Sequence, residues 1–343
     1  MKALYIHSEK DLHLSDAPQE SMGDGEVLVA INHGGICGSD LHYYNHGGFG
    51  AVRLREPMVL GHEVAGTVLE AGSGVTSLKV GDRVAVSPSR PCGACIYCDK
   101  KQYNHCLNMR FYGSAMPFPH IQGAFRQRLP ALESQCHKLG DGVSTVEGAF
   151  AEPFAVTLHA ANRAGDLKGK RVLITGCGPI GALAIMAAQT RGAGEIVVTD
   201  IADGALERAK ALGADRTVNT LSDPSGLDKD KAHKGTFDVC FEASGVQAAL
   251  HGALEALRPG GVMVQLGLGG DITLPLNMLV AKEIELRGTF RFHEEFAEAV
   301  DLINRRAVPV LDLLTDTFPL EEAQAAFERA NDKSRAMKVQ LAF

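Results

Sequence analysis

The chain has 343 residues, of which 45% are hydrophobic and 22% are charged, and its formal net charge is −7. This length predicts roughly two domains, and the acidic balance argues against a surface built for nucleic acid or an anionic membrane. The start of the chain mixes charged with apolar residues, and no apolar run reaches the ~18 residues of a membrane span, so neither a signal peptide nor a transmembrane helix is predicted. We therefore expect a cytoplasmic protein whose thiols stay reduced.

The first part of the chain, up to about residue 155, has short β-type segments separated by glycine, proline, asparagine and aspartate. They lie at residues 26–32, 63–72 and 81–87. Short strands with such turn signals predict a twisted, partly open antiparallel barrel.

From about residue 170 the pattern changes to strands that alternate with helices. We expect strands at 171–175, 195–200, 237–244 and 261–267, and helices at 179–193, 204–214 and 246–260. This alternation predicts a parallel, doubly wound sheet. The polar segment 223–235 is expected to be a surface connection, and a strand at 284–290, two amphipathic helices and a closing strand at 336–343 follow.

Four of the eight cysteines lie within one short stretch, "CGACIYCDKKQYNHC". Two CxxC steps put Cys92, Cys95 and Cys98 on one tight loop, and Cys106 completes the set. In a reducing compartment this spacing favours metal ligation over a disulfide. Four thiolates make a closed, structural zinc site that leaves no position for substrate. The alternative is a redox CxxC pair or a set of unrelated buried cysteines.

The turn after the strand at 171–175 reads "TGCGPIG" and has Gly176, Gly178 and Gly181 in the GxGxxG spacing. It follows a predicted strand and opens a predicted helix, and Asp200 ends the next strand. Glycines there allow a pyrophosphate to approach the helix N-terminus, while the carboxylate accepts hydrogen bonds from ribose hydroxyls. No arginine follows Asp200 closely to neutralise a 2′-phosphate, so we expect NAD rather than NADP.

A second candidate metal site comes from three separated pieces of the first part. They supply Cys37, His62 with Glu63, and Glu152. One thiolate, one imidazole and carboxylates form the mixed donor set typical of catalytic zinc with an open position. A hydride carrier works with a Lewis acid, and this chain has candidates for both.

The stretch "GHEVAGTVLEAGSGV" resembles the signature of the zinc-containing medium-chain dehydrogenases, and the four-cysteine loop and "TGCGPIG" follow in that family's order and spacing. The resemblance covers essentially the whole chain. It implies an α/β protein with a GroES-like, β-rich catalytic domain and structural zinc lobe at 1–155. A doubly wound Rossmann domain that binds NAD would occupy 156–288, and residues 289–343 would return to the catalytic domain.

One departure within the family is informative. Alcohol dehydrogenases have a cysteine as third protein ligand, whereas this chain has Glu152 in "AEP" at the matching place, which resembles the sorbitol and polyol dehydrogenases. Carried over residue by residue, the resemblance implies that Cys37, His62 and either Glu63 or Glu152 bind the catalytic zinc, directly or through water. The sequence leaves the choice between the two carboxylates open.

The same resemblance implies roles in proton transfer. The pKa of an alcohol falls when its oxygen is bound to zinc, so that its carbon can give up hydride to the nicotinamide. Ser39 is then placed to accept the hydroxyl proton, and His42 to relay it toward solvent. Asp40 is expected to support the zinc-bound imidazole. The plain alternatives are a helix cap for Ser39 and a surface histidine for His42.

Further contacts are implied for the cofactor and the substrate. Beside the glycines and Asp200, the expected cofactor-binding residues are Pro179, Ile180, Leu266, Leu268 and Phe290. The expected substrate residues are Tyr43, Arg110, Phe111, His120 and Arg291.

Substrate choice depends on "NMRFYGSAMPFPHIQG", where Arg110 stands at a position that is small in sorbitol dehydrogenases. An added guanidinium suggests recognition of a carboxylate, for which arginine has bidentate geometry. "MRFYGSAM" and "GTFRF" resemble the L-idonate 5-dehydrogenases, which oxidise a sugar acid at C5. We therefore expect Arg110, with His120 or Arg291, to hold the acid group, unless Arg110 makes only a surface salt bridge.

Three alternatives stay open. Polyol oxidation of the sorbitol or xylitol type is the nearest, and threonine dehydrogenase is more distant. A catalytically silent NAD-binding relative is the third, although such a protein would be expected to lose Cys37, His62 or Glu152. The expected partners are a small sugar acid or polyol and further copies of the chain in a dimer or tetramer.

Overall fold

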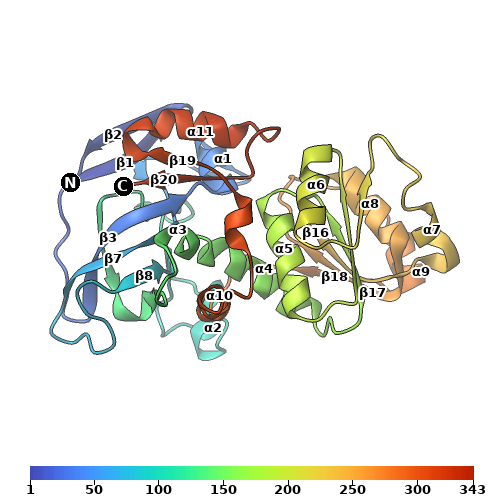
Figure 1. Cartoon of the computed structure of the whole chain (residues 1–343), viewed down its shortest axis with the longest axis horizontal. Coiled ribbons are helices and arrows are strands. Elements are labelled where there is room, and N and C mark those ends of the chain that lie inside the picture. The colour runs from blue at the N-terminus through green and yellow to red at the C-terminus, as the bar shows by residue number, and fades with distance from the viewer. The chain divides into compact units, whose positions relative to one another are not determined.

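The computed structural model describes all residues, 1–343, and the chain divides into two compact units. The first unit consists of Met1–Glu152 and Phe296–Phe343, and the second unit is Pro153–Glu295. The first unit is thus built from both ends of the chain, coloured blue to green and red in Figure 1. No helix in the structure combines the length and the apolarity needed to cross a membrane.

A mainly antiparallel sheet forms the centre of the first unit. Its strand order is β12-β8-β7-β3-β20-β19, with β11 also paired to β3, and only β19 and β20 run parallel. The bounds are β3 (Glu26–Gly35), β7 (Glu63–Ala71), β8 (Arg83–Val86), β11 (Arg128–Leu132), β12 (Cys136–Lys138), β19 (Leu314–Pro319) and β20 (Lys338–Ala342). β20 comes from the C-terminus, so the end of the chain completes the sheet that the beginning starts.

Short elements surround this sheet. A small sheet joins β1 (Lys2–Ser8), β2 (Asp11–Asp16) and β6 (Met58–Val59), and two further pairs are β4 (Gly48–Phe49) with β5 (Val52–Arg53) and β9 (Ser89–Arg90) with β10 (Arg110–Phe111). The helices are α1 (Gly38–His46), α2 (Ile96–Asp99), α3 (Thr145–Gly148) and α11 (Ala323–Asn331), with 3₁₀ turns η1 (Tyr103–His105), η2 (Glu133–Gln135), η4 (Val310–Leu313) and η5 (Leu320–Glu322). Two helices, α4 (Ala151–Ala164) and α10 (Glu295–Asn304), continue from one unit into the other.

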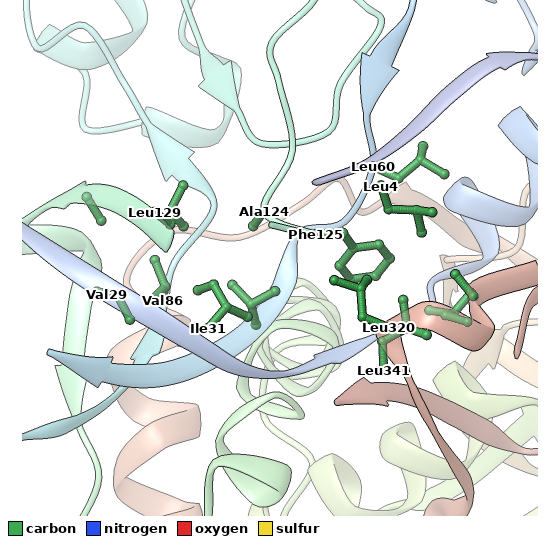
Figure 2. Close-up of a cluster of buried hydrophobic side chains, with 14 of the residues drawn as sticks. Leu4, Val29, Ile31, Leu60, Val86, Ala124, Phe125, Leu129, Leu320 and Leu341 are labelled. Atoms are coloured by element: carbon green, nitrogen blue, oxygen red, sulfur yellow. The ribbon is translucent and has the colours of Figure 1, made fainter. Parts of the chain in front are cut away.

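The core of the first unit is a continuous cluster of aliphatic side chains around Phe125 (Figure 2). Val29 and Ile31 come from alternate positions of β3, as expected when one face of a strand is buried. Leu320 and Leu341 come from the C-terminal segment and lie in the same cluster as Leu4. Burial of apolar surface therefore ties the two ends of the chain together.

The second unit contains a six-stranded parallel sheet of order β15-β14-β13-β16-β17-β18. The strands are β13 (Arg171–Thr175), β14 (Glu195–Asp200), β15 (Arg216–Asn219), β16 (Phe237–Glu242), β17 (Leu257–Gln265) and β18 (Glu285–Gly288). The helices are α5 (Pro179–Thr190), α6 (Asp203–Ala211), α7 (Asp228–Lys231), α8 (Gln247–Ala256) and α9 (Leu276–Lys282), with the 3₁₀ turn η3 (Ala232–Lys234). The α/β class and the doubly wound sheet are confirmed.

Two local expectations differ from the structure. The helix expected over 246–260 ends at Ala256, and β17 begins at Leu257. Pro259 explains the early end, because the residue before a proline is disfavoured in the helical region and proline lacks the N–H a helix needs. The connection 223–235 is not wholly irregular, since it contains α7 and the buried Asp230.

Asp230 anchors the amino-end edge of the parallel sheet. Its carboxylate pairs with Arg171 at the start of β13 and with Arg216 at the start of β15. It is 2% exposed, whereas both arginine side chains reach solvent. The pairs thereby tie α7 to two strands that neighbour β14.

We expect Asp230→Asn to lower the stability of the second unit by about 2 kcal/mol, because the buried side chain loses its charge-assisted hydrogen bonds to Arg171 and Arg216. Urea titration followed by circular dichroism measures the loss. The matched control is Asp228→Asn in the same helix, whose carboxylate is largely exposed. Equal stability of the two variants would contradict the assigned role of Asp230.

Candidate metal centres and cofactor site

The dispersed residues of the first unit come together at one place. Ligand atoms of Cys37, His62 and Glu63 all lie within 4.8 Å of one another. Cys37 immediately precedes α1, and Glu63 is the first residue of β7. His62 and Glu63 are buried, and Cys37 is partly buried. A helix start and a strand start therefore bring a sulfur, a nitrogen and an oxygen donor to a common centre.

Asp40 links the segment that contains Cys37 to the segment that contains His62. Its carboxylate accepts hydrogen bonds from the Cys37 N–H at 3.0 Å and from the Gly61 N–H at 3.2 Å, and its Oδ1 lies 3.9 Å from Nδ1 of His62. The side chain is fully buried, and burial raises its pKa. The expected supporting role of Asp40 toward the imidazole is consistent with this position.

Acidic groups crowd the centre. Burial, reinforced by the Glu63 carboxylate, raises the pKa of the Cys37 thiol to about 12. Burial likewise raises the pKa of Glu152 to about 8, with Glu63 adding to the effect and His62 opposing it. Lys338, the first residue of β20, pairs with Glu63 and donates to the Ile36 carbonyl at 3.1 Å. Burial lowers the pKa of Lys338, but Glu63 and Cys37 outweigh burial and raise it.

The donor set fits zinc. Sulfur, imidazole nitrogen and carboxylate oxygen are ligands that zinc accepts together, and a divalent cation would favour the ionised forms of the thiol and carboxylates. Nδ1 of His62 is buried without a hydrogen-bond partner and lies toward Asp40, which suits a histidine that binds a metal ion through its other ring nitrogen. Glu152 lies outside the three-residue group, although it is close enough to interact electrostatically with His62 and Glu63.

The two predicted relay residues lie on α1. The Ser39 hydroxyl interacts with the Cys37 thiol and lowers its pKa, although burial dominates. His42 is half-buried, and burial lowers its pKa, helped by His46 and Lys333. Its ring centroid is 6.2 Å from that of the exposed His46. One helix thus carries the half-buried Ser39 near its start, the half-buried His42 in its middle and the exposed His46 at its end.

The four-cysteine loop also closes on itself. The sulfurs of Cys92, Cys95, Cys98 and Cys106 lie within 4.8 Å of one another, with Cys95 at 3.6 Å from Cys98 and 3.9 Å from Cys106. N–H groups of Leu107 and Cys98 lower the pKa of Cys95 to about 6, whereas burial raises that of Cys106 to about 11. Four sulfurs at this separation suit one tetrahedral zinc ion.

The glycine turn of the second unit joins β13 to α5. Gly176 has φ of +82°, and a Cβ there would lie 2.9 Å from the Ser244 backbone. A Cβ at Gly181 would lie 1.9 Å from the Gly176 oxygen, so the helix packs directly on the turn. Gly178 caps α5 and Pro179 and Ile180 begin it, which suits a dinucleotide pyrophosphate at the helix N-terminus.

Asp200 stands at the end of β14, beside this turn. Its Oδ2 accepts from the Cys177 N–H at 2.7 Å, and its Oδ1 accepts from Ile201 and Ala202. Carboxylate oxygens have further lone pairs, so these bonds orient Asp200 without exhausting its capacity for ribose hydroxyls. Of the other expected cofactor residues, Leu268 and Phe290 are exposed apolar side chains, and Leu266 follows the carboxyl end of β17.

The expected substrate residues of the first unit differ in burial and in hydrogen-bond partners. Phe111 is buried with its ring 5.7 Å from that of His62. Arg110 is exposed, and alternation along β10 directs it to the face opposite Phe111. The hydroxyl of buried Tyr43 accepts from the Ala115 N–H at 3.0 Å. His120 uses both ring nitrogens inside its loop, toward the Arg55 N–H and the Pro117 carbonyl, which leaves neither for a substrate.

Arg291, the remaining candidate, follows the carboxyl end of β18 in the second unit. It has φ of +55°, an uncommon conformation for a non-glycine residue, and its guanidinium lies 4.9 Å from the Phe290 ring. Uncommon backbone conformations cluster at functional sites. Of the three predicted acid-binding residues, Arg291 is the one that follows a strand of the parallel sheet at its carboxyl end.

Two buried residues at these sites escaped the sequence analysis. Lys338 lies in the closing strand, where a lone lysine gives no sign of burial. Glu242 ends β16 and is fully buried at the carboxyl edge of the parallel sheet. An acidic residue at the end of an apolar strand could have indicated a buried carboxylate from the sequence alone.

Comparison with known proteins establishes the class. The alcohol dehydrogenase GroES-like domain matches residues 23–141, and the zinc-binding dehydrogenase family matches residues 179–305. The chain belongs to the zinc-binding, medium-chain alcohol dehydrogenase family.

Among individual relatives, L-idonate 5-dehydrogenase (NAD(P)(+)) of Escherichia coli is 47% identical over 318 residues, 92% of each chain. The crystal structure of L-idonate 5-dehydrogenase from Escherichia coli superposes with a TM-score of 0.96 at 43% identity, covering 100% of this chain and 98% of that one. Sorbitol dehydrogenase of Gallus gallus is 37% identical over 343 residues, 99% of this chain and 95% of the relative.

We expect Cys95→Ser to remove zinc from the four-cysteine loop only. Metal analysis of the purified variant should fall from two zinc ions per chain to one, because three thiolates hold zinc less well than four. The three remaining thiols of the loop, Cys92, Cys98 and Cys106, should then react faster with a thiol reagent. The matched control, Cys136→Ser, alters a buried cysteine outside both groups and should keep both ions. Two retained ions in Cys95→Ser would refute the structural zinc site.

Proposed function

We propose that the protein is a zinc- and NAD-dependent dehydrogenase of a sugar acid, which oxidises L-idonate to 5-dehydro-D-gluconate. The observation that carries the proposal is the Cys37, His62 and Glu63 donor set in a chain 47% identical to an L-idonate 5-dehydrogenase. Oxidation of the C5 alcohol to a ketone removes a hydride, which NAD accepts, and a proton. The reaction therefore yields the ketone, NADH and H⁺.

Cys37, His62 and Glu63 are proposed to hold the catalytic zinc, with Glu152 as an exchangeable neighbour. Zinc supplies Lewis acidity toward the substrate hydroxyl when bound. Ser39 receives the hydroxyl proton, and His42 passes it toward solvent along α1. A lowered pKa keeps His42 neutral near pH 7 and therefore able to accept that proton. Phe111 packs against His62 and limits water at the centre.

Arg291 is proposed to bind the carboxylate of the sugar acid. A guanidinium offers paired N–H donors that match a carboxylate. Its place after the carboxyl end of β18 supports the proposal, because ligands of doubly wound sheets bind at that edge. Polyol oxidation is the second candidate, favoured by the 37% identity to a sorbitol dehydrogenase and by Glu152 in the "AEP" position.

We further propose a cytoplasmic homo-oligomer. The eight free cysteines support a reducing compartment. Leu276 and Val280 of α9 are 65% and 77% exposed, and apolar side chains at such a surface favour association between copies.

The central test is a panel of L-idonate, D-gluconate, sorbitol, xylitol and L-threonine with NAD, followed by NADH absorbance. L-idonate should give the highest kcat/KM. Cys37→Ser should lower the rate with L-idonate by about a thousandfold or more, since a Lewis acid contributes several kcal/mol, while the four-cysteine zinc is retained. Sorbitol or xylitol turned over at least as well as L-idonate would overturn the sugar-acid assignment.

Arg291→Ala should raise KM for L-idonate by about tenfold or more, because a charge-assisted hydrogen-bond pair is worth about 1.5–3 kcal/mol. The residual activity with sorbitol should stay nearly constant, since sorbitol has no carboxylate. Arg110→Ala is the matched control, as an exposed arginine on the face away from Phe111. A KM increase confined to Arg110→Ala would reverse the assignment of the two arginines.

Asp200→Ala should shift the cofactor preference toward NADP by about tenfold, because it removes hydrogen bonds to ribose hydroxyls and repulsion of a 2′-phosphate. The ratio of kcat/KM values for the two cofactors measures the shift. Asp203→Ala, three residues on, should leave the ratio unchanged, as its carboxylate accepts from Asn219 instead. An unaltered ratio in Asp200→Ala would remove the carboxylate from cofactor selection.

A further inference from the structure

Glu242 is a fully buried carboxylate that the proposed chemistry does not use. It ends β16, where its Cα partners are Thr175 at the end of β13 and Gln265 at the end of β17. The strand order reverses between β13 and β16, because β13 continues to β14 on its other side. Such a switch point, at the carboxyl ends of the strands, is where doubly wound sheets bind their ligands. Glu242 therefore lies directly beneath the candidate cofactor site.

The Glu242 carboxylate is satisfied entirely by uncharged donors from three strand ends. Its Oε1 accepts from Thr175 Oγ1 at 3.2 Å, from the Ser244 N–H at 3.0 Å and from the Ser244 hydroxyl. Its Oε2 accepts from the Gly245 N–H at 3.0 Å and from the Gln265 amide. Each oxygen has only donors around it, so the site demands an acceptor at both oxygens.

These hydrogen bonds fix the turn after β16, residues 243–246, against its neighbours. A Cβ at Gly267 would lie 2.2 Å from the Gly245 nitrogen, and a Cβ at Gly269 would lie 1.7 Å from the Gly245 oxygen. On the other side, a Cβ at Gly176 would lie 2.9 Å from the Ser244 backbone. Three glycine-containing turns thus pack on one another, and their common support is the Glu242 carboxylate.

The two halves of a dinucleotide occupy different halves of such a sheet. Asp200 at the end of β14 lies on the side proposed for the adenosine ribose. The turns after β16 and β17, with Leu266 and Leu268, lie on the side of β13 that receives the other mononucleotide. A residue that shapes only the β16 and β17 turns therefore acts on the nicotinamide half.

We infer that Glu242 is a positioning residue for the nicotinamide half of the cofactor. It holds the 243–246 turn and, through Gly245, the loop after β17 in the conformation that receives the nicotinamide mononucleotide. The inference rests on the proposed NAD-dependent function. In that function Glu242 contacts the turns that receive the cofactor and does not contact the reacting atoms.

The test is Glu242→Gln, which keeps the size of the side chain but places an NH₂ group against donors. We expect the NADH dissociation constant, from NADH fluorescence, to rise about tenfold, as for a buried donor left unsatisfied. The dissociation constant of AMP, from its displacement of NADH, should change by less than about twofold, because Asp200 and the Gly176 turn bind the adenosine half. Ser244→Ala, which removes one donor to the same carboxylate, should show the same asymmetry with a smaller rise and serves if Glu242→Gln does not fold.

The matched control is Asp230→Asn, a buried carboxylate at the amino-end edge of the same sheet. It should lower stability and leave the NADH dissociation constant unchanged. NADH binding by Glu242→Gln within about twofold of the unmodified protein, or equal weakening of NADH and AMP, would overturn the inference. If the variants change NADH binding as expected but the unmodified protein does not oxidise L-idonate, only the proposed substrate is overturned.

Discussion

The burial of several acidic groups around one lysine is the constraint on which the first unit depends. Cys37 and Glu152 lie in a water-poor centre with Lys338, and burial raises the pKa of both acidic groups. A protein interior tolerates such a group only when charges are paired or a cation is bound. Lys338 belongs to β20, so the C-terminal segment must return to β3 before the centre can be balanced. Metal binding and completion of the sheet are therefore expected to be linked.

The two units solve the problem of placing reactive groups in different ways. In the first unit an antiparallel sheet and α1 meet at buried Asp40, which bonds to the backbone beside Cys37 and His62. In the second unit the parallel sheet gathers its turns at the carboxyl edge, where N–H groups point outward and suit an anionic cofactor. The second unit has one buried carboxylate at each edge of this sheet, Asp230 at the amino ends of the strands and Glu242 at their carboxyl ends. Asp230 pairs with arginines at the amino-end edge, whereas Glu242 collects neutral donors beneath the glycine turns.

Much of this could be read from the residues alone because the relevant signals are local. Strand and helix alternation, the GxGxxG turn and the CxxC steps depend on neighbours in sequence, and the structure has each of these elements near its expected place. The errors also have local causes, as when Pro259 ended α8 earlier than its apolar periodicity suggested. The substrate residues were harder, because Arg110 and Phe111 are adjacent in sequence yet face opposite sides of β10. His120 has the residue type of a ligand, but its hydrogen bonds hold its own loop.

By itself the sequence determined the α/β class, the presence of two donor clusters and the position of the dinucleotide turn, since composition, spacing and periodicity encode these directly. Only the tertiary structure shows that the Glu63 carboxylate lies in one group with Cys37 and His62 and that Glu152 lies outside it, because residue type and spacing alone do not separate two acidic residues. It likewise decided that Lys338 is buried beside Glu63 and that Glu242 lies under three turns. Those facts depend on contacts between strands distant in sequence, and a residue's type does not reveal which distant group will share its burial.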